Sequence, residues 1–162
     1  MKSIRKVLMT FTILSIVIFA NQPTNMGFNI GINGSNHTGP NISESNIKFG
    51  FCGGLYLSHK ISQGLYFHPE VNFTMKGDKT EFFGHDVTTT LNYIDIPILL
   101  GIPITNELKL MPGIYGGFGI GGKVESDDNE ESIDSEMFQN PEFGLTLGFQ
   151  LVKIGLRYSH GL

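Results

Sequence analysis

The feature that most constrains this chain is an unbroken alternation of apolar and polar residues over positions 65–76. One set of positions holds Leu65, Phe67, Pro69, Val71, Phe73 and Met75, and the other holds Tyr66, His68, Glu70, Asn72, Thr74 and Lys76. Because successive side chains of a β-strand point to opposite faces, the pattern predicts a strand with one apolar and one polar face. Its twelve residues are close to the length that a tilted strand needs to cross a bilayer.

Similar alternation recurs along the chain and predicts about seven strands. The other segments are residues 26–34, 47–58, 89–101, 108–123, 140–151 and a last one that begins at Lys153. The expected connections alternate in length: residues 35–46, 77–88 and 124–139 are long and polar, whereas residues 59–64, 102–107 and the joint near Val152 are short. Long loops at one end and tight turns at the other are typical of outer-membrane β-barrels, in which the short turns are periplasmic.

The N-terminus predicts export from the cytoplasm. Lys2, Arg5 and Lys6 precede an apolar run over residues 7–19, and the small residue Ala20 follows. This layout is typical of a secretory signal peptide, predicted at 1–20, and the run is too short to span a membrane as a helix. Residues 21–162 would then form a single domain. The formal charge of −4 gives no basic excess for nucleic acid.

The glycines indicate which face of the strands points inward. Most glycines within the predicted strands lie on the polar face, and the lumen of a small barrel needs small residues beside large ones. The alternative is a soluble, lipocalin-like barrel, which would bury the apolar face. Ionisable groups share the polar face with the glycines, which favours an all-β, antiparallel, up-and-down transmembrane β-barrel with its apolar face in lipid.

Three segments resemble the PorT-like outer-membrane β-barrel proteins of the Bacteroidetes group. Residues 93–100, Tyr-Ile-Asp-Ile-Pro-Ile-Leu-Leu, are similar to that family's central strand. Residues 65–78, with His68-Pro69-Glu70 and Lys76-Gly77, resemble its third strand, and residues 155–162 resemble its penultimate one. The resemblance implies an eight-stranded barrel in the outer membrane of a Gram-negative bacterium and, from the founding members, an association with protein secretion. The family continues through a further loop and strand, so we expect the domain either to be incomplete at its C-terminus or to close its barrel in another way.

An eight-stranded barrel is only wide enough to be filled by its own side chains, so inward ionisable groups should meet one another. The predicted structural network of the lumen consists of Lys48, His68, Glu70, Asp95, Lys109, Glu142 and Arg157. We expect the three carboxylates to pair with Lys48, Lys109 and Arg157, since charges cannot remain alone in a low-dielectric interior. The alternative is a path for protons, ions or small solutes, which would make the barrel a narrow channel.

The sequence contains no complete motif for catalysis or for cofactor binding. Residues 117–122 match the spacing GxGxxG, but an acidic segment follows where a phosphate-binding loop needs a helix. Ser159 and His160 are neighbours in a strand and point opposite ways, which excludes a catalytic pair. We therefore expect no enzyme activity, no cofactor and no metal. The expected partners are outer-membrane lipid, lipopolysaccharide, the barrel-assembly machinery and, through the resemblance, secretion-system proteins.

Overall fold

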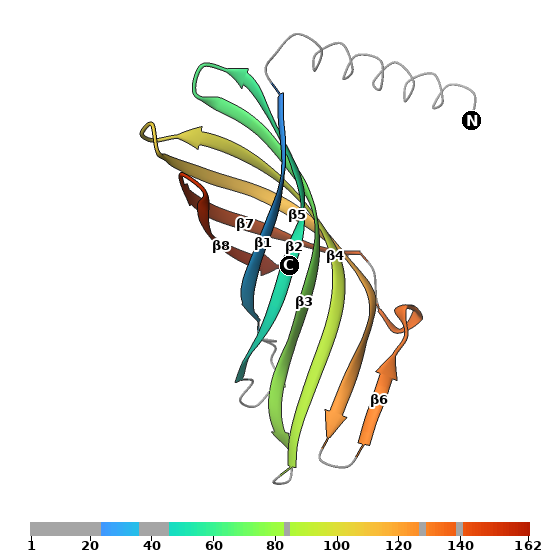
Figure 1. Ribbon diagram of the computed structural model, residues 1–162. Coiled ribbons are helices and arrows are strands. Elements are labelled where there is room, and N and C mark those ends of the chain that lie inside the picture. Colours follow the sequence, from blue (N-terminus) through green and yellow to red (C-terminus); the bar gives the residue numbers. More distant parts are fainter. Residues whose placement is uncertain (1–23, 36–45, 83–84, 127–128, 139–140) are drawn as a thin grey trace, which may run out of the picture.

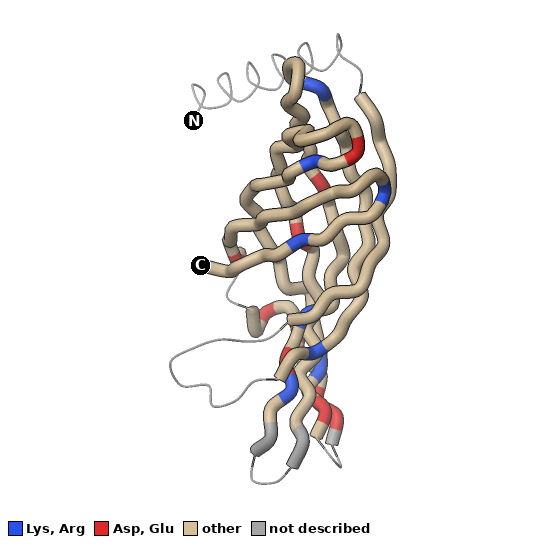
Figure 2. The backbone as a smooth tube through the Cα atoms, turned by 90° about the vertical axis from the view of Figure 1, so that its left-hand side faces the viewer, with Lys and Arg blue, Asp and Glu red and all other residues tan. Residues whose placement is uncertain are grey.

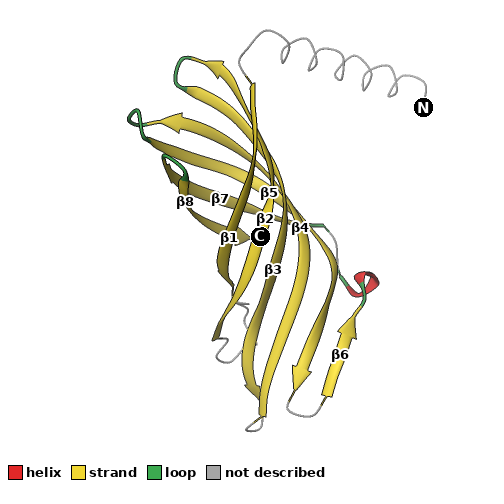
Figure 3. Ribbon diagram, viewed as in Figure 1, coloured by secondary structure: helices red, strands yellow, loops and turns green. Residues whose placement is uncertain are grey.

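The computed structural model describes residues 24–35, 46–82, 85–126, 129–138 and 141–162. They form almost nothing but strand (Figure 3). The strands are β1 (Thr24–Ser35), β2 (Asn46–Ser62), β3 (Leu65–Phe82), β4 (His85–Pro103), β5 (Leu108–Ser126), β6 (Asn129–Ile133), β7 (Glu142–Leu151) and β8 (Ile154–Gly161), with one 3-10 turn, η1 (Ser135–Met137). The predicted signal peptide lies outside the described residues.

Seven of these strands form one continuous antiparallel sheet in the order β1-β2-β3-β4-β5-β7-β8, and β6 pairs with the far end of β5. The sheet is strongly curled into a half-barrel, with its tight turns gathered at one end (Figure 1). This confirms the predicted fold class and the count of about seven strands. Among the described residues, β1 pairs only with β2 and β8 only with β7, so no backbone ladder joins these two edges.

The two faces of the sheet are the reverse of those in a soluble protein. Along β7, the side chains of Phe143, Leu145, Leu147 and Phe149 are exposed, while Gly144, Thr146 and Gly148 between them are buried. The apolar side chains on the outer face of β1 are even more exposed, since Phe28 is 75% and Ile30 is 84% exposed. Such a continuous apolar outer surface is stable only against lipid, whereas the concave face buries the polar groups.

Two expected outer loops are instead largely strand, which corrects the boundaries predicted at residues 77–88 and 124–139. The ladder between β3 and β4 continues without interruption to the pair Phe82 and His85, and β5 and β6 pair as far as Ser126 and Asn129. Apolar alternation stops where the strands leave the lipid, but backbone pairing does not depend on it and still satisfies the amide groups. The hydrophobic period therefore marked the membrane-crossing part and not the end of each strand.

Cross-strand pairs of tyrosine and glycine shape the inner face. The four pairs in direct register are Gly27 with Tyr56, Tyr66 with Gly101, Tyr93 with Gly119, and Tyr115 with Gly144. At Gly27 a Cβ atom would lie only 2.5 Å from the Tyr56 ring, so the ring lies directly over the glycine backbone. A large aromatic that covers a facing glycine pins the strand register and lets rings fit a narrow lumen.

The turn between β7 and β8 contains the one non-glycine residue with positive φ among the described residues. Val152 has φ of 54°, a left-handed conformation that is costly for a β-branched side chain. Its side chain is exposed, and its amide donates to the carbonyl of Glu107 at 2.8 Å. We expect Val152→Asn to raise the free energy of unfolding by about 1 kcal/mol, because asparagine tolerates this conformation.

Denaturant titration of the folded protein in lipid vesicles measures this change. Val87→Asn is the control, because its residue is in regular extended strand and gains nothing from a tolerance of positive φ. If Val152→Asn destabilised the protein, the left-handed turn would be wrong.

Candidate functional site

Glu70 on β3 is the centre of the most densely bonded polar cluster on the concave face. Its side chain is 2% exposed, and Arg157 on β8 donates to both carboxylate oxygens, through Nη2 to Oε1 at 2.6 Å and through Nη1 to Oε2 at 2.9 Å. Asn72 Nδ2 donates to Oε2 at 2.7 Å and Asn29 Nδ2 donates to the same atom at 3.3 Å. His68 Nε2 lies 3.2 Å from Oε1. A carboxylate this deeply buried is stable because each oxygen has several donors.

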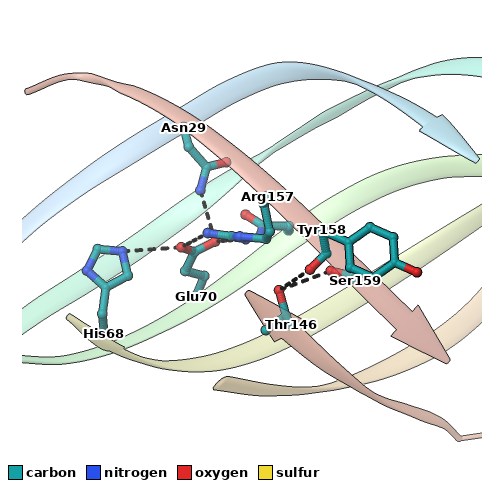
Figure 4. A network of polar contacts seen from close by, with 8 residues as sticks. Asn29, His68, Glu70, Thr146, Arg157, Tyr158 and Ser159 are labelled. Atoms are coloured by element: carbon teal, nitrogen blue, oxygen red, sulfur yellow. Dashed lines mark hydrogen bonds and ion pairs between the residues drawn. The ribbon is translucent and has the colours of Figure 1, made fainter. Parts of the chain in front are cut away.

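This cluster ties together strands that lie at opposite ends of the sheet. Figure 4 shows Arg157 of β8 meeting Glu70 of β3, with His68 on one side and Asn29 of β1 on the other. Next to it, Thr146 Oγ1 donates to the carbonyl of Tyr158 at 3.2 Å, and Ser159 Oγ donates to Thr146 Oγ1 at 3.1 Å. Side chains thus connect β1 and β8 through Glu70, and the connection runs across the lumen.

A second cluster surrounds Lys76 of β3. Its Nζ lies 3.0 Å from Asp95 Oδ1 and 3.7 Å from Glu142 Oε2, and it also stands 4.3 Å from the centre of the Tyr93 ring. The Tyr115 hydroxyl donates to Glu142 Oε1 at 2.7 Å. One ammonium therefore holds two carboxylates from β4 and β7 together, and the tyrosine rings fill the space around it.

The two clusters differ from the predicted pairing, in which Lys48 and Lys109 neutralised lumen carboxylates. Lys48 is buried but lies opposite Ser35 at the outer end of β2, eight residues beyond Tyr56, which is the register partner of Glu70. At about 3.3 Å per residue this separation is about 26 Å along the strand. Lys109 lies at the other end of the barrel, where its Nζ stands 5.0 Å from the centre of the Tyr66 ring. Both lysines lie on the concave face of the sheet, but their positions along the strands keep them from the lumen carboxylates with which they were predicted to pair.

Lys76, Tyr115 and Asn72 carry much of the network and were not among the predicted site residues. The alternation placed Lys76 and Asn72 on the polar face, so a signal existed, but nothing in the sequence assigned them to Asp95 or Glu70. Phe138, which follows η1, was missed altogether. Its ring packs edge-on against Tyr93, with centroids 5.6 Å apart, and covers Gly119. No alternation precedes Phe138, so no sequence pattern indicated that it returns to the lumen.

Neither cluster has the composition of a metal or cofactor site. Within the described ranges, no three His, Cys, Asp or Glu side chains are grouped so that they could hold a metal ion. A search of the described residues also finds no helix with the length and apolarity to cross a membrane. The bidentate pair of Glu70 with Arg157 and the cluster of Lys76 with two carboxylates neutralise buried charge and fill the space inside the sheet.

Comparison with known protein families agrees with this arrangement, in which the apolar face is outside and the polar face is inside. The sequence profile of the family described as outer membrane protein beta-barrel domain matches residues 19–162. The chain belongs to this family. It is therefore an integral outer-membrane β-barrel protein, with its apolar face toward lipid and its charged clusters in the lumen. Searches of curated proteins and of solved structures found no match to the chain.

Membership and geometry together argue against the soluble, lipocalin-like alternative. A soluble barrel would bury the large apolar side chains and expose the ionisable ones, whereas here Phe28, Ile30 and their neighbours are exposed and Glu70 is buried. The family also sets the orientation, because short turns of such barrels face the periplasm. The turns after β2, β4 and β7 thus mark the periplasmic end, and the hairpins of β3 with β4 and of β5 with β6 extend outward.

Proposed function

We propose that this protein is a non-conducting, non-enzymatic outer-membrane barrel that acts as a scaffold. The single observation that carries the proposal is the pair of ion-pair clusters across the lumen. Glu70 with Arg157 spans from β3 to β8, and Lys76 bridges β4 and β7. A path for ions would need mobile, hydrated charges, but here the charges bond to one another, and the Tyr93 and Tyr115 rings lie beside the Lys76 ammonium.

The outer hairpins supply the surface through which such a scaffold acts. The β3, β4 and β5 strands continue well beyond the roughly ten residues that cross a bilayer, and the short β6 strand pairs with the outer end of β5. Charged residues gather toward the outer ends of these strands (Figure 2). One tip holds Lys123 between Glu125 and Glu130, with N–O distances of 2.6 and 3.7 Å. The hydrogen bond with Glu125 raises the pKa of Lys123 above its ordinary value.

We also propose where in the cell the protein lies and which molecules it contacts. The protein would be exported by a cleaved signal peptide over residues 1–20, be inserted by the barrel-assembly machinery of a Gram-negative bacterium, and contact outer-membrane lipid and lipopolysaccharide. The resemblance of residues 93–100 to the PorT-like family supports an assembly role beside secretion-system proteins. Ser159 bonds to Thr146 and not to His160, which supports a role without nucleophilic catalysis.

Planar-bilayer recording tests the plugged lumen. We expect the reconstituted protein to show no discrete conductance steps, because both clusters close the lumen. Heat-modifiable migration on a denaturing gel supplies the control that the barrel is folded. Discrete steps that Glu70→Ala or Arg157→Ala lowers would contradict the proposal and favour the second candidate, a narrow channel for ions or small solutes.

A further inference from the structure

A cavity of about 240 Å³ lies inside the barrel near the turns, on the periplasmic side of the Glu70 cluster. Its lining comes from six of the strands that form the curled sheet, β1 to β5 and β7. The volume is below the roughly 300–1,000 Å³ of sites for drug-sized ligands, so it suits a molecule of about one ring. The proposed scaffold role makes no use of this cavity.

The cavity holds a cation that has no counter-charge. Lys109 lines it, and no carboxylate within the described ranges pairs with this ammonium, whose Nζ lies 5.0 Å from the centre of the Tyr66 ring. Glu107, the acidic residue of the neighbouring turn, is exposed and does not line the cavity. A lysine that faces a partly enclosed space without a partner favours an anion there, because the anion restores neutrality.

The remaining lining adds a specific chemistry. Asn25 and Ser58, which are register partners on β1 and β2, face the cavity with hydrogen-bonding groups that no side chain of the described protein engages. Tyr56 and Tyr66 also line the cavity, and the Tyr56 ring is stacked on the His68 ring at a centroid distance of 4.8 Å. His68 in turn contacts Glu70, so the Glu70 cluster lies next to the cavity on its outer side.

We propose that this cavity is a periplasm-facing binding site for a small monocarboxylate. The carboxylate pairs with Lys109 and accepts hydrogen bonds from Ser58 and Asn25, while a planar or aliphatic body packs against the side chains of Tyr56 and Tyr66. One ammonium matches one negative charge, which favours a carboxylate over a phosphate dianion. The ligand enters from the periplasm and returns there, since the cluster around Glu70 closes the other side.

Calorimetric titration of the full chain in detergent micelles, with benzoate as the probe, tests the site. We expect saturable binding that Lys109→Met weakens by about tenfold or more, since a hydrogen bond to a charged group contributes about 1.5 to 3 kcal/mol. Ser58→Leu, which narrows the cavity without a change of charge, should weaken binding as well. Lys153→Met is the matched control, because Lys153 is an exposed lysine at the same end of the barrel and should leave affinity unchanged.

Three results would overturn the site, namely no saturable benzoate binding beyond that of empty micelles, equal affinity in Lys109→Met, or equal affinity for neutral benzamide. Tighter binding of inorganic phosphate than of benzoate would overturn the carboxylate class. Heat-modifiable migration of each variant shows that it is folded. The titration measures binding and not conductance. A failure to bind benzoate would therefore leave the proposed scaffold role intact, and discrete conductance steps would leave the proposed binding site intact.

Discussion

Arg157→Met should lower the free energy of unfolding by about 3 to 5 kcal/mol, the largest loss expected from any side-chain truncation in this barrel. The substitution leaves Glu70, whose side chain is 2% exposed, without the cation that pairs with both its oxygens. It also removes the bond between β8 and β3 that crosses the lumen. An uncompensated buried carboxylate is costly because the amide groups of Asn72 and Asn29, which still donate to it, are neutral.

Removing the charge of Glu70 instead of that of Arg157 should cost less stability. The difference between the two losses distinguishes an ion pair with one buried member from an exposed ion pair. Arg157 is 34% exposed, so water can solvate its guanidinium when Glu70→Gln removes the charge. We expect that variant to lose about 1 to 3 kcal/mol. The double variant should lose less than the sum of the two, since neither charge then remains unpaired.

Denaturant unfolding in lipid vesicles, read from the folded and unfolded bands on a gel, gives all three values. Lys123→Met is the control, because it breaks an ion pair whose members are 41% and 43% exposed and should leave stability unchanged. Equal losses for Arg157→Met and Lys123→Met would contradict the burial of the Glu70 cluster.

Gly144→Ala should also be strongly destabilising although it adds a single methyl group. Its Cβ would overlap the Tyr115 ring, where Cζ is 2.7 Å away, and would collide with the carbonyl oxygen of His160. The ring cannot move freely, because its hydroxyl is bonded to Glu142 at 2.7 Å, and the backbone oxygen belongs to the adjacent strand. Overpacking of this kind costs about 1 to 3 kcal/mol, and here it also disturbs the Lys76 cluster.

Gly155→Ala is the matched control for that variant. Gly155 is a strand glycine on β8, but the nearest atom to an added Cβ is the Phe149 carbonyl oxygen at 3.7 Å, an ordinary contact. Unfolding of both variants in the same vesicles compares a covered glycine with an open one. Should the two alanines prove equally tolerated, the register of Tyr115 opposite Gly144 would be incorrect.

The charged site was only half predictable. Period-two alternation assigned Glu70, Asp95 and Lys109 to one face, because a strand has only two faces. Which charges pair depends on how deep each residue lies in the barrel, and depth follows from inter-strand register. The register partner of Asp95 is Gly117, and Lys109 lies about 26 Å from Gly117 along β5. Lys109 therefore cannot reach Asp95, and Lys76 is the cation that pairs with this carboxylate.

The ends of the strands, like the charge pairs, could be predicted from the sequence only in part. The apolar period stops at the membrane boundary near Lys76, but the β3 strand continues to Phe82 because its backbone remains paired with β4. Segments rich in Thr and charged residues look like loops when hydrophobic alternation is the only signal. Pairing with a neighbour, which no single segment reveals, turned them into outer hairpins.

The sequence by itself determined the fold class, the number of membrane-crossing strands and the face of each side chain, because these follow from local alternation and from the demand that lipid contact only apolar groups. The tertiary structure alone decided which charges meet, which glycines lie beneath tyrosine rings, and that Lys109 is left facing a cavity. Each of these depends on the register and curl of the sheet, which bring residues as far apart as Glu70 and Arg157 within 2.6 Å. The ribbon at residues 65–76 shows both levels, since its alternation assigned Glu70 to the lumen and the curl of the sheet supplied its partner.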